Sequence, residues 1–220
     1  DKTAQFANDT LSGFTDSSAV RSFNSRDGLL WIISDNGNVY NVDFSGTTIP
    51  FVSLDASAGN FYYEEDKNVL WILSDIGIIR KNLLNNQKKV FKHDPKNSNS
   101  LVSMNVFNML ADNEGNIWMA NHFQGLDKFN INTEQFTNIR YDTNNSASLV
   151  NDSTHVLFFD REHYLWIGTH NGLSRMDTKT GICINYINDP NDSLSLAKGH
   201  INSITQDKND IIWIGTDVDI

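Results

Sequence analysis

All five tryptophans of this 220-residue chain lie in one short motif that recurs along the sequence. In each copy the tryptophan follows Leu or Ile and precedes Ile or Met, and the five are Trp31, Trp71, Trp118, Trp166 and Trp213. Successive copies are 40, 47, 48 and 47 residues apart. A period of this length is typical of repeat architectures, in which each unit is one supersecondary structure packed against its neighbours. We therefore expect the chain to consist of structural repeats.

Each repeat carries the signals of two turns around its tryptophan. An acidic residue precedes the tryptophan by six positions in four copies, and these are Glu65, Asp112, Asp160 and Asp207, with Ser25 in the first copy. Turn-forming residues lie between the acid and the tryptophan, and apolar runs flank them, which predicts a β-hairpin. A glycine follows the tryptophan by six or seven positions in four copies, Gly37, Gly77, Gly125 and Gly172. These glycines predict a second hairpin turn.

The remainder of each repeat supplies two more strands and a connector. In the fourth copy, for example, residues 172–177 and 182–187 read as strands separated by a turn at 178–181. Each repeat is thus expected to be a four-stranded antiparallel meander. Three polar connectors join the last four repeats, and they end in Leu101, Leu149 and Leu196. These leucines are expected to pin the connector to the sheet edge.

Four-stranded units of this size with one aromatic landmark each are typical of the blades of a β-propeller. A tryptophan suits this role because it brings a large apolar area to the contact between blades. The apolar spacing of two rather than three or four excludes a helical solenoid. The predicted fold class is therefore all-β, a partial β-propeller with about four full blades and a partial blade at both ends.

Aligning the repeats on their tryptophans predicts the position of every blade in a single propeller segment spanning residues 1–220. Residues 1–18 would end one blade, the four full blades would occupy 19–58, 59–104, 105–152 and 153–199, and residues 200–220 would start another. An alternative is that the N-terminal strand completes the last blade and closes a ring, although that blade would then lack its third strand. In an open arrangement, unpaired sheet edges and uncovered blade faces predict self-association.

Composition excludes several classes of function. The net charge of −10 and the pI near 4.9 argue against a nucleic-acid partner, which needs a basic surface. No run of about eighteen apolar residues exists, so no membrane-spanning helix or membrane contact is expected. The single cysteine, Cys183, excludes an intramolecular disulfide and a multi-cysteine metal site, and its alternating surroundings predict an ordinary strand residue.

No catalytic, metal or cofactor motif emerges from the sequence. The six histidines show no paired-ligand spacing, and no phosphate-binding loop, dinucleotide fingerprint or nucleophile elbow is present. Paired carboxylates operate glycosidases, but an acid repeated in nearly every unit is better explained by a turn in every unit. We therefore expect no catalytic residue, no metal and no cofactor.

Residues that break the repeat are the candidates for function. Loops between second and third strands share one face of a propeller with the starts of the innermost strands, and the third repeat has an insertion there. Aromatic, amide and imidazole groups on such a face suit sugar recognition, because rings stack and hydroxyls need donors and acceptors. The candidate ligand-binding residues are Asn105, Asn121, His122, Phe123, Gln124, His170, Asn171, His200 and Asp217. Asn105, Ser153 and His200 each lie thirteen positions before a tryptophan.

Residues 165–181 and 212–216 closely resemble the two-component regulator propeller repeat, and the connectors ending in Ser-Leu are similar to that family. The first two repeats depart from its pattern, because Ile33-Ser34 and Leu73-Ser74 replace the Gly-Thr pair. The resemblance implies the periplasmic sensor region of a hybrid two-component histidine kinase of Bacteroides-type bacteria. In such proteins two seven-bladed propellers precede a β-sandwich, a membrane helix and the kinase, and the family typically senses oligosaccharides.

The leading hypothesis is accordingly a non-catalytic, extracytoplasmic ligand-recognition region whose parent responds to an oligosaccharide. One alternative is a glycan-active propeller enzyme, which would need asymmetrically placed acids. Another is a structural or dimerisation propeller without a ligand of its own.

Overall fold

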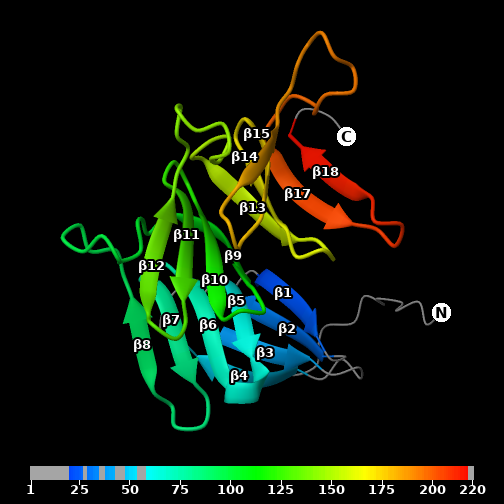
Figure 1. Cartoon of the computed structure of the whole chain (residues 1–220). Coiled ribbons are helices and arrows are strands. Elements are labelled where there is room, and N and C mark those ends of the chain that lie inside the picture. The colour runs from blue at the N-terminus through cyan, green and yellow to red at the C-terminus, as the bar shows by residue number, and fades with distance from the viewer. Residues whose placement is uncertain (1–19, 27–28, 35–37, 43–47, 54–57, 218–220) are drawn as a thin grey trace. The chain divides into compact units, whose positions relative to one another are not determined.

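Antiparallel strands form nearly all of the regular structure (Figure 1). The computed structural model describes residues 20–26, 29–34, 38–42, 48–53 and 58–217. These residues divide into two compact units, one within residues 1–90 and the other within 91–220. The described part contains no helix with the length and hydropathy needed to cross a membrane.

The first unit holds two four-stranded sheets in which the strands follow chain order. One sheet contains β1 (Val20–Arg26), β2 (Leu29–Ser34), β3 (Asn38–Val42) and β4 (Thr48–Ser53). The other contains β5 (Ala58–Glu64), β6 (Val69–Ser74), β7 (Gly77–Asn82) and β8 (Lys88–Phe91), which ends at the division between the units. A 3-10 turn, η1 (Glu65–Lys67), lies between β5 and β6.

The second unit repeats the same meander twice and begins it a third time. Its first sheet contains β9 (Val106–Ala111), β10 (Asn116–Asn121), β11 (Gly125–Asn130) and β12 (Gln135–Ile139). The next contains β13 (Thr154–Phe159), β14 (Leu165–Thr169), β15 (Gly172–Met176) and β16 (Cys183–Tyr186). A two-stranded sheet of β17 (Ile201–Gln206) and β18 (Ile212–Thr216) follows. The all-β class and the four-stranded antiparallel blade are thus confirmed. The expected N-terminal strand in residues 1–18 lies outside the described residues.

The repeated acid has a second function besides closing the turn. Asp112 Oδ1 accepts a hydrogen bond from the backbone N–H of Asn116 at 2.8 Å, which closes the turn as expected. Its Oδ2 accepts the indole N–H of Trp118 at 2.9 Å. The same carboxylate–indole bond joins Asp160 to Trp166 at 2.7 Å. A buried indole N–H needs an acceptor, and the acid supplies one in the third and fourth repeats.

The second repeat departs from the expected position of this acid. Trp71 donates its indole N–H to Glu64 rather than to Glu65, with Nε1 and Oε2 separated by 3.4 Å. Glu65 begins η1 instead, so the assignment of Glu65 was wrong. In the second repeat Glu64 pairs with Val69, whereas in the third repeat Asp112 pairs with Asn116. The turn between β5 and β6 is therefore one residue longer than the turn between β9 and β10, and the acid that reaches the tryptophan is Glu64.

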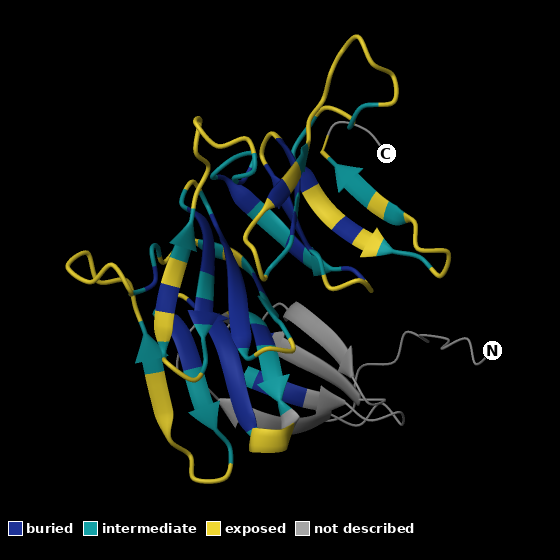
Figure 2. Ribbon diagram, in the orientation of Figure 1, coloured by how far each residue is buried: buried dark blue, intermediate teal, exposed yellow. Residues whose placement is uncertain are grey.

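Trp118 and Trp166 each pack toward the repeat that follows in the chain. Trp118 lies in a buried cluster with Leu157, Leu165 and Met176, and Trp166 lies in another with Ile201 and Ile204. The second strands β10 and β14 are buried along their whole length (Figure 2). Burial therefore concentrates on the inner strands and on the faces between successive sheets.

The connectors are held as expected. Leu101 and Leu149 are fully buried, and Leu196 packs against the last cluster. The connector backbone also bonds to the fourth strand of the next sheet, since Phe136 N–H donates to Asn99 O at 3.1 Å and Cys183 N–H to Ala147 O at 2.8 Å. Each connector thus covers an outer sheet edge that would otherwise remain unpaired.

Candidate functional site

The first strands of all three sheets in the second unit begin with a β-bulge. In β13 the register moves from Thr154 opposite Thr169 to Val156 opposite Gly168, so His155 is the extra residue. The same shift in β9 makes Phe107 the extra residue, because Val106 pairs with Asn121 and Asn108 with Ala120. Bulges redirect side chains at sheet ends, often beside binding sites. Phe107 and His155 occupy equivalent positions, eleven residues before their tryptophans.

Four histidine and two phenylalanine rings, two of them from these bulges, lie together at one end of the sheets. The rings belong to Phe107, His122, Phe123, His155, His170 and His200. His155 stacks on Phe107 with ring centroids 5.0 Å apart, and His122 stacks on Phe123 at 3.8 Å. His155 also lies 6.1 Å from both His170 and His200. We call this set the ring cluster.

Backbone hydrogen bonds hold the loops of the ring cluster to the strand starts in a repeated way. The residue four positions after each tryptophan donates its N–H to the carbonyl thirteen positions before that tryptophan. The pairs are His122 to Asn105 at 3.0 Å, His170 to Ser153 at 2.9 Å and Asp217 to His200 at 3.2 Å. The fold therefore fixes the loop and the strand start at a constant separation, while the side chains at both places vary between repeats.

Side-chain bonds then orient three of the imidazoles. Asn105 Nδ2 lies 3.0 Å from His122 Nδ1. His200 Nδ1 lies 3.3 Å from Asp217 Oδ2, and Asp217 Oδ1 accepts the His200 backbone N–H at 2.7 Å. Ser153 Oγ lies 3.3 Å from His155 Nε2. These contacts fix ring positions before any ligand arrives, which lowers the entropic cost of binding.

The phenylalanines leave much of their surface open to solvent. Phe107 is 45% exposed and Phe123 is 57% exposed. Phe123 also adopts a φ of 60°, a left-handed conformation that costs energy for a bulky residue. An exposed aromatic ring held in a strained loop next to a second exposed ring offers a stacking surface.

The charge of the ring cluster depends on whether its histidines are protonated. Burial, and after it the neighbouring imidazoles of His122, His170 and His200, lower the pKa of His155, whereas Asp217 opposes the shift. Burial disfavours the charged imidazole, and so does a second positive charge nearby. His155 is therefore neutral near pH 7.

Comparison with known proteins adds an independent observation on this end of the chain. Residues 195–218, which supply His200 and Asp217, match the family model described as the two component regulator propeller. This segment is therefore similar to a two-component regulator propeller repeat. The resemblance expected from the sequence is thereby confirmed. No curated protein sequence matches the chain significantly.

Solved structures share this repeat fold at low sequence identity. The extracellular domain of the putative hybrid two component system BT4673 from B. thetaiotaomicron matches 94% of this chain and 26% of its own, with 20% identity and a TM-score of 0.68. The corresponding domain of BT3049 from the same organism matches 91% and 33%, with 20% identity and a TM-score of 0.53. The WD40 beta propeller domain of Doa1 matches 90% and 60%, with 13% identity and a TM-score of 0.64. The chain thus spans about a quarter to a third of the two-component proteins it resembles.

The propeller repeats bring most of the candidate residues together. Of the nine, Asn105, His122, Phe123, His170, His200 and Asp217 belong to the ring cluster or bond directly to it. The other three lie in different surroundings. Asn121 is buried and donates its backbone N–H to Thr154 Oγ1 at 2.8 Å, and Gln124 accepts a bond from Arg140 at 2.7 Å. Asn171 is exposed and bonds through its backbone N–H to Thr169 Oγ1 at 3.2 Å.

Phe107 and His155 were missed from the sequence although both are central to the ring cluster. Strand alternation assigns a residue's direction by counting in twos, and a bulge interrupts that count. The signal that could have found them is the shared position eleven residues before the tryptophan, where the third repeat has Phe and the fourth has His.

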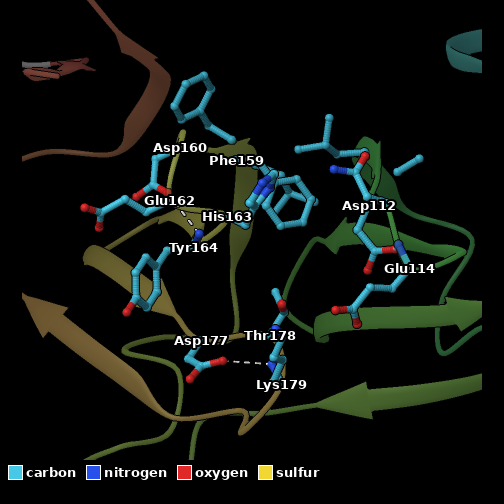
Figure 3. Close-up of a pocket in the computed structure, with 15 residues that line it drawn as sticks. Asp112, Glu114, Phe159, Asp160, Glu162, His163, Tyr164, Asp177, Thr178 and Lys179 are labelled. Carbon is cyan, nitrogen blue, oxygen red and sulfur yellow. Dashed lines mark hydrogen bonds between the residues drawn. The ribbon is translucent and has the colours of Figure 1, made fainter. Parts of the chain in front are cut away.

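A groove of about 660 Å³ lies at the opposite end of the same strands. Figure 3 shows that it is lined by the turns after β9, β13 and β15, with Asp112, Asp160 and Asp177 among its carboxylates. Asp112 and Asp160 accept hydrogen bonds from their turns and from the indole N–H groups, and Asp177 Oδ1 accepts the backbone N–H of Lys179 at 2.9 Å. These acids therefore serve the turns of the propeller repeat. Among the residues that the structure describes, no group of three or more His, Cys, Asp or Glu side chains is arranged to hold a metal ion.

Proposed function

We propose that this chain is part of the extracytoplasmic, non-catalytic ligand-recognition region of a two-component signalling system, and that the ring cluster binds an oligosaccharide. The observation that carries the proposal is the ring cluster itself, in which exposed phenylalanines and hydrogen-bonding imidazoles meet at one end of three successive repeats. The two-component regulator propeller repeat, matched at residues 195–218, supports the signalling role.

The chemistry of the ring cluster suits sugars in two ways. Phe107 and Phe123 offer apolar faces for the C–H side of a pyranose ring. Asn105 and the imidazoles supply donors and acceptors for hydroxyl groups, because a neutral imidazole carries one of each. A few placed polar groups beside aromatic surface are typical of small-molecule sites.

The parent protein is proposed to be an inner-membrane histidine kinase whose sensor region lies in the periplasm. Solved extracellular domains of putative hybrid two component systems have the same fold, which supports this location. The kinase would lie in another part of the parent chain.

Calorimetric titration of the intact sensor region with an oligosaccharide panel tests the proposal. We expect Phe123→Ala and His170→Ala to weaken binding about 10-fold or more, since each removes one stacking or hydrogen-bonding contact. His163→Asn is the matched control, because His163 is exposed on the turn after β13, at the other end of the strands, and Asn tolerates its φ of 66°. Unchanged affinity in both variants would exclude the ring cluster as the sugar site.

A second candidate function, self-association, is favoured by the last tryptophan. Trp213 is 59% exposed, whereas Trp118 and Trp166 are covered by the sheets that follow them. Ile211 beside it is also exposed. We propose that this face of β18 packs on a second copy of the chain. Sedimentation of the wild type and of Trp213→Ser across concentration tests this, and a wild-type protein that stays monomeric at micromolar concentration would refute it.

A further inference from the structure

The ring cluster contains four groups that can become cations, and one carboxylate bonds to it. His122 comes from the loop after β10, His155 from β13, His170 from the loop after β14, and His200 precedes β17. The carboxylate is that of Asp217, which follows β18 and bonds to His200. Arg140 and Asp152, the nearest charged pair around Gln124, bond to each other at 2.8 Å. Among the described residues, no ion pair joins the imidazole of His122, His155 or His170 to a carboxylate, although the charge of Asp217 acts on His155.

Such a cluster is unfavourable to protonate on its own. Each imidazolium raises the energy of the next because the ring centroids are only 3.4–6.1 Å apart. An anion seated among the rings reverses this effect, since it attracts every positive charge that forms. Binding of an anion and uptake of a proton are therefore coupled, and each promotes the other.

At least one imidazole is available to such an anion. His170 is exposed, and its ring nitrogens have no hydrogen-bond partner among residues 58–217. Phe107 and Phe123 both lie against His122, with ring centroids 5.0 and 3.8 Å from it. A sugar stacked on these rings would place a charged substituent beside the imidazoles.

We infer that the ligand of the ring cluster is an acidic oligosaccharide, bearing a carboxylate or sulfate group that pairs with protonated His155 and His170 and is taken up with a proton. The inference rests on the proposed sugar-binding function and specifies the ligand class and its pH dependence. Affinity is then expected to rise as the pH falls through the range in which histidine protonates.

A glycan array probed with the full 220-residue chain at about pH 5.5 and about pH 7.5 tests the inference, because these values bracket the ordinary histidine pKa. The panel would contain oligogalacturonides, their methyl-esterified forms with the same backbone and no charge, and sulfated and unsulfated chondroitin disaccharides. We expect the chain to bind the more highly charged glycan of each pair in preference to its counterpart. Its binding should be about 10-fold stronger at the lower pH, since one linked proton changes affinity by up to tenfold per pH unit. The carboxylate and sulfate pairs distinguish the two sources of negative charge.

Two variants assign the pH dependence to the ring cluster. His155→Phe keeps an aromatic ring against Phe107 but removes the proton site, and His170→Gln does so at an exposed position where folding is not at risk. We expect either change to remove most of the gain at low pH, whereas His163→Asn retains it. Calorimetry in two buffers of different ionisation enthalpy would measure the proton uptake directly.

The outcomes separate this inference from the proposed function. Retention of uncharged glycans with equal strength at both pH values would overturn the acidic-ligand inference and leave sugar binding intact. Equal competition by sodium sulfate or sodium acetate would also overturn it, because the site would then bind any small anion. Retention of no glycan at either pH would contradict sugar binding itself.

Discussion

The carboxylate of Asp160 accepts the indole N–H of Trp166 across 2.7 Å, and both side chains are buried. The other oxygen of Asp160 accepts the backbone N–H of Tyr164 at 2.9 Å, so one side chain closes the turn and satisfies the tryptophan. This double use explains why acid and tryptophan recur together along the chain. It also gives these acids a structural role, since each oxygen of Asp160 accepts a hydrogen bond from its own repeat.

Replacing Asp160 by Ala should therefore destabilise the fold strongly. The variant leaves the indole N–H and a turn amide without acceptors, which predicts a loss of about 3 kcal/mol in the free energy of unfolding. Urea denaturation followed by tryptophan fluorescence measures it. Asp207→Ala is the control, because its partner Trp213 is exposed and water can replace the carboxylate. Equal losses in the two variants would contradict the role of burial.

The connector leucines should differ sharply in their contribution to stability. Leu149 is fully buried among Trp118, Leu157 and Cys183, so Leu149→Ala is expected to cost about 2–5 kcal/mol by leaving a cavity. Leu194 lies in the next connector but is 93% exposed, so Leu194→Ala should change stability by less than about 0.5 kcal/mol. Thermal unfolding of both variants under one buffer condition makes the comparison. A small effect at position 149 would show that the connector is not held by its leucine.

Cys183 should be unreactive in the native state. Burial raises the pKa of its thiol from 9.0 to about 11, and only the thiolate attacks thiol reagents. At about pH 8 ionisation alone predicts labelling about 100-fold slower in the folded than in the unfolded chain. Because Cys183 is the single cysteine, the colour released by a disulfide reagent reports on this site alone. Rapid labelling without denaturant would be inconsistent with a buried Cys183.

Stability should decrease in mild acid because of His155. Its pKa is lowered in the folded state, so the unfolded chain binds a proton more readily than the folded chain does. Above the ordinary value of 6.5 both states are neutral and the group has no effect. As the pH falls through 6.5 toward the folded-state value, the unfolded state gains protons first and the free energy of unfolding decreases. His155→Phe should reduce this decrease, whereas His163→Asn should not, as denaturation curves between about pH 7.5 and pH 5 would show.

The sequence by itself determined the repeat and the blade. Trp118, Trp166 and the acids six residues before them predicted hairpins at the correct places, because turn chemistry and strand alternation act over a few neighbouring residues. The packing of the leucines that end the connectors was also predictable, since Leu101, Leu149 and Leu196 recur at the period of the repeat. Where the turn length changed by one residue, at Glu64, this local rule assigned the wrong acid.

The ring cluster was decided by tertiary structure. His122 and His170 share a position in their repeats, whereas His155 and His200 lie at other positions, and the four meet because successive sheets place equivalent ends side by side. The β-bulges then turn Phe107 and His155 toward the other rings, against the alternation of an ideal strand. Local pattern specifies which elements form, whereas the packing of one sheet on the next selects which side chains share a site.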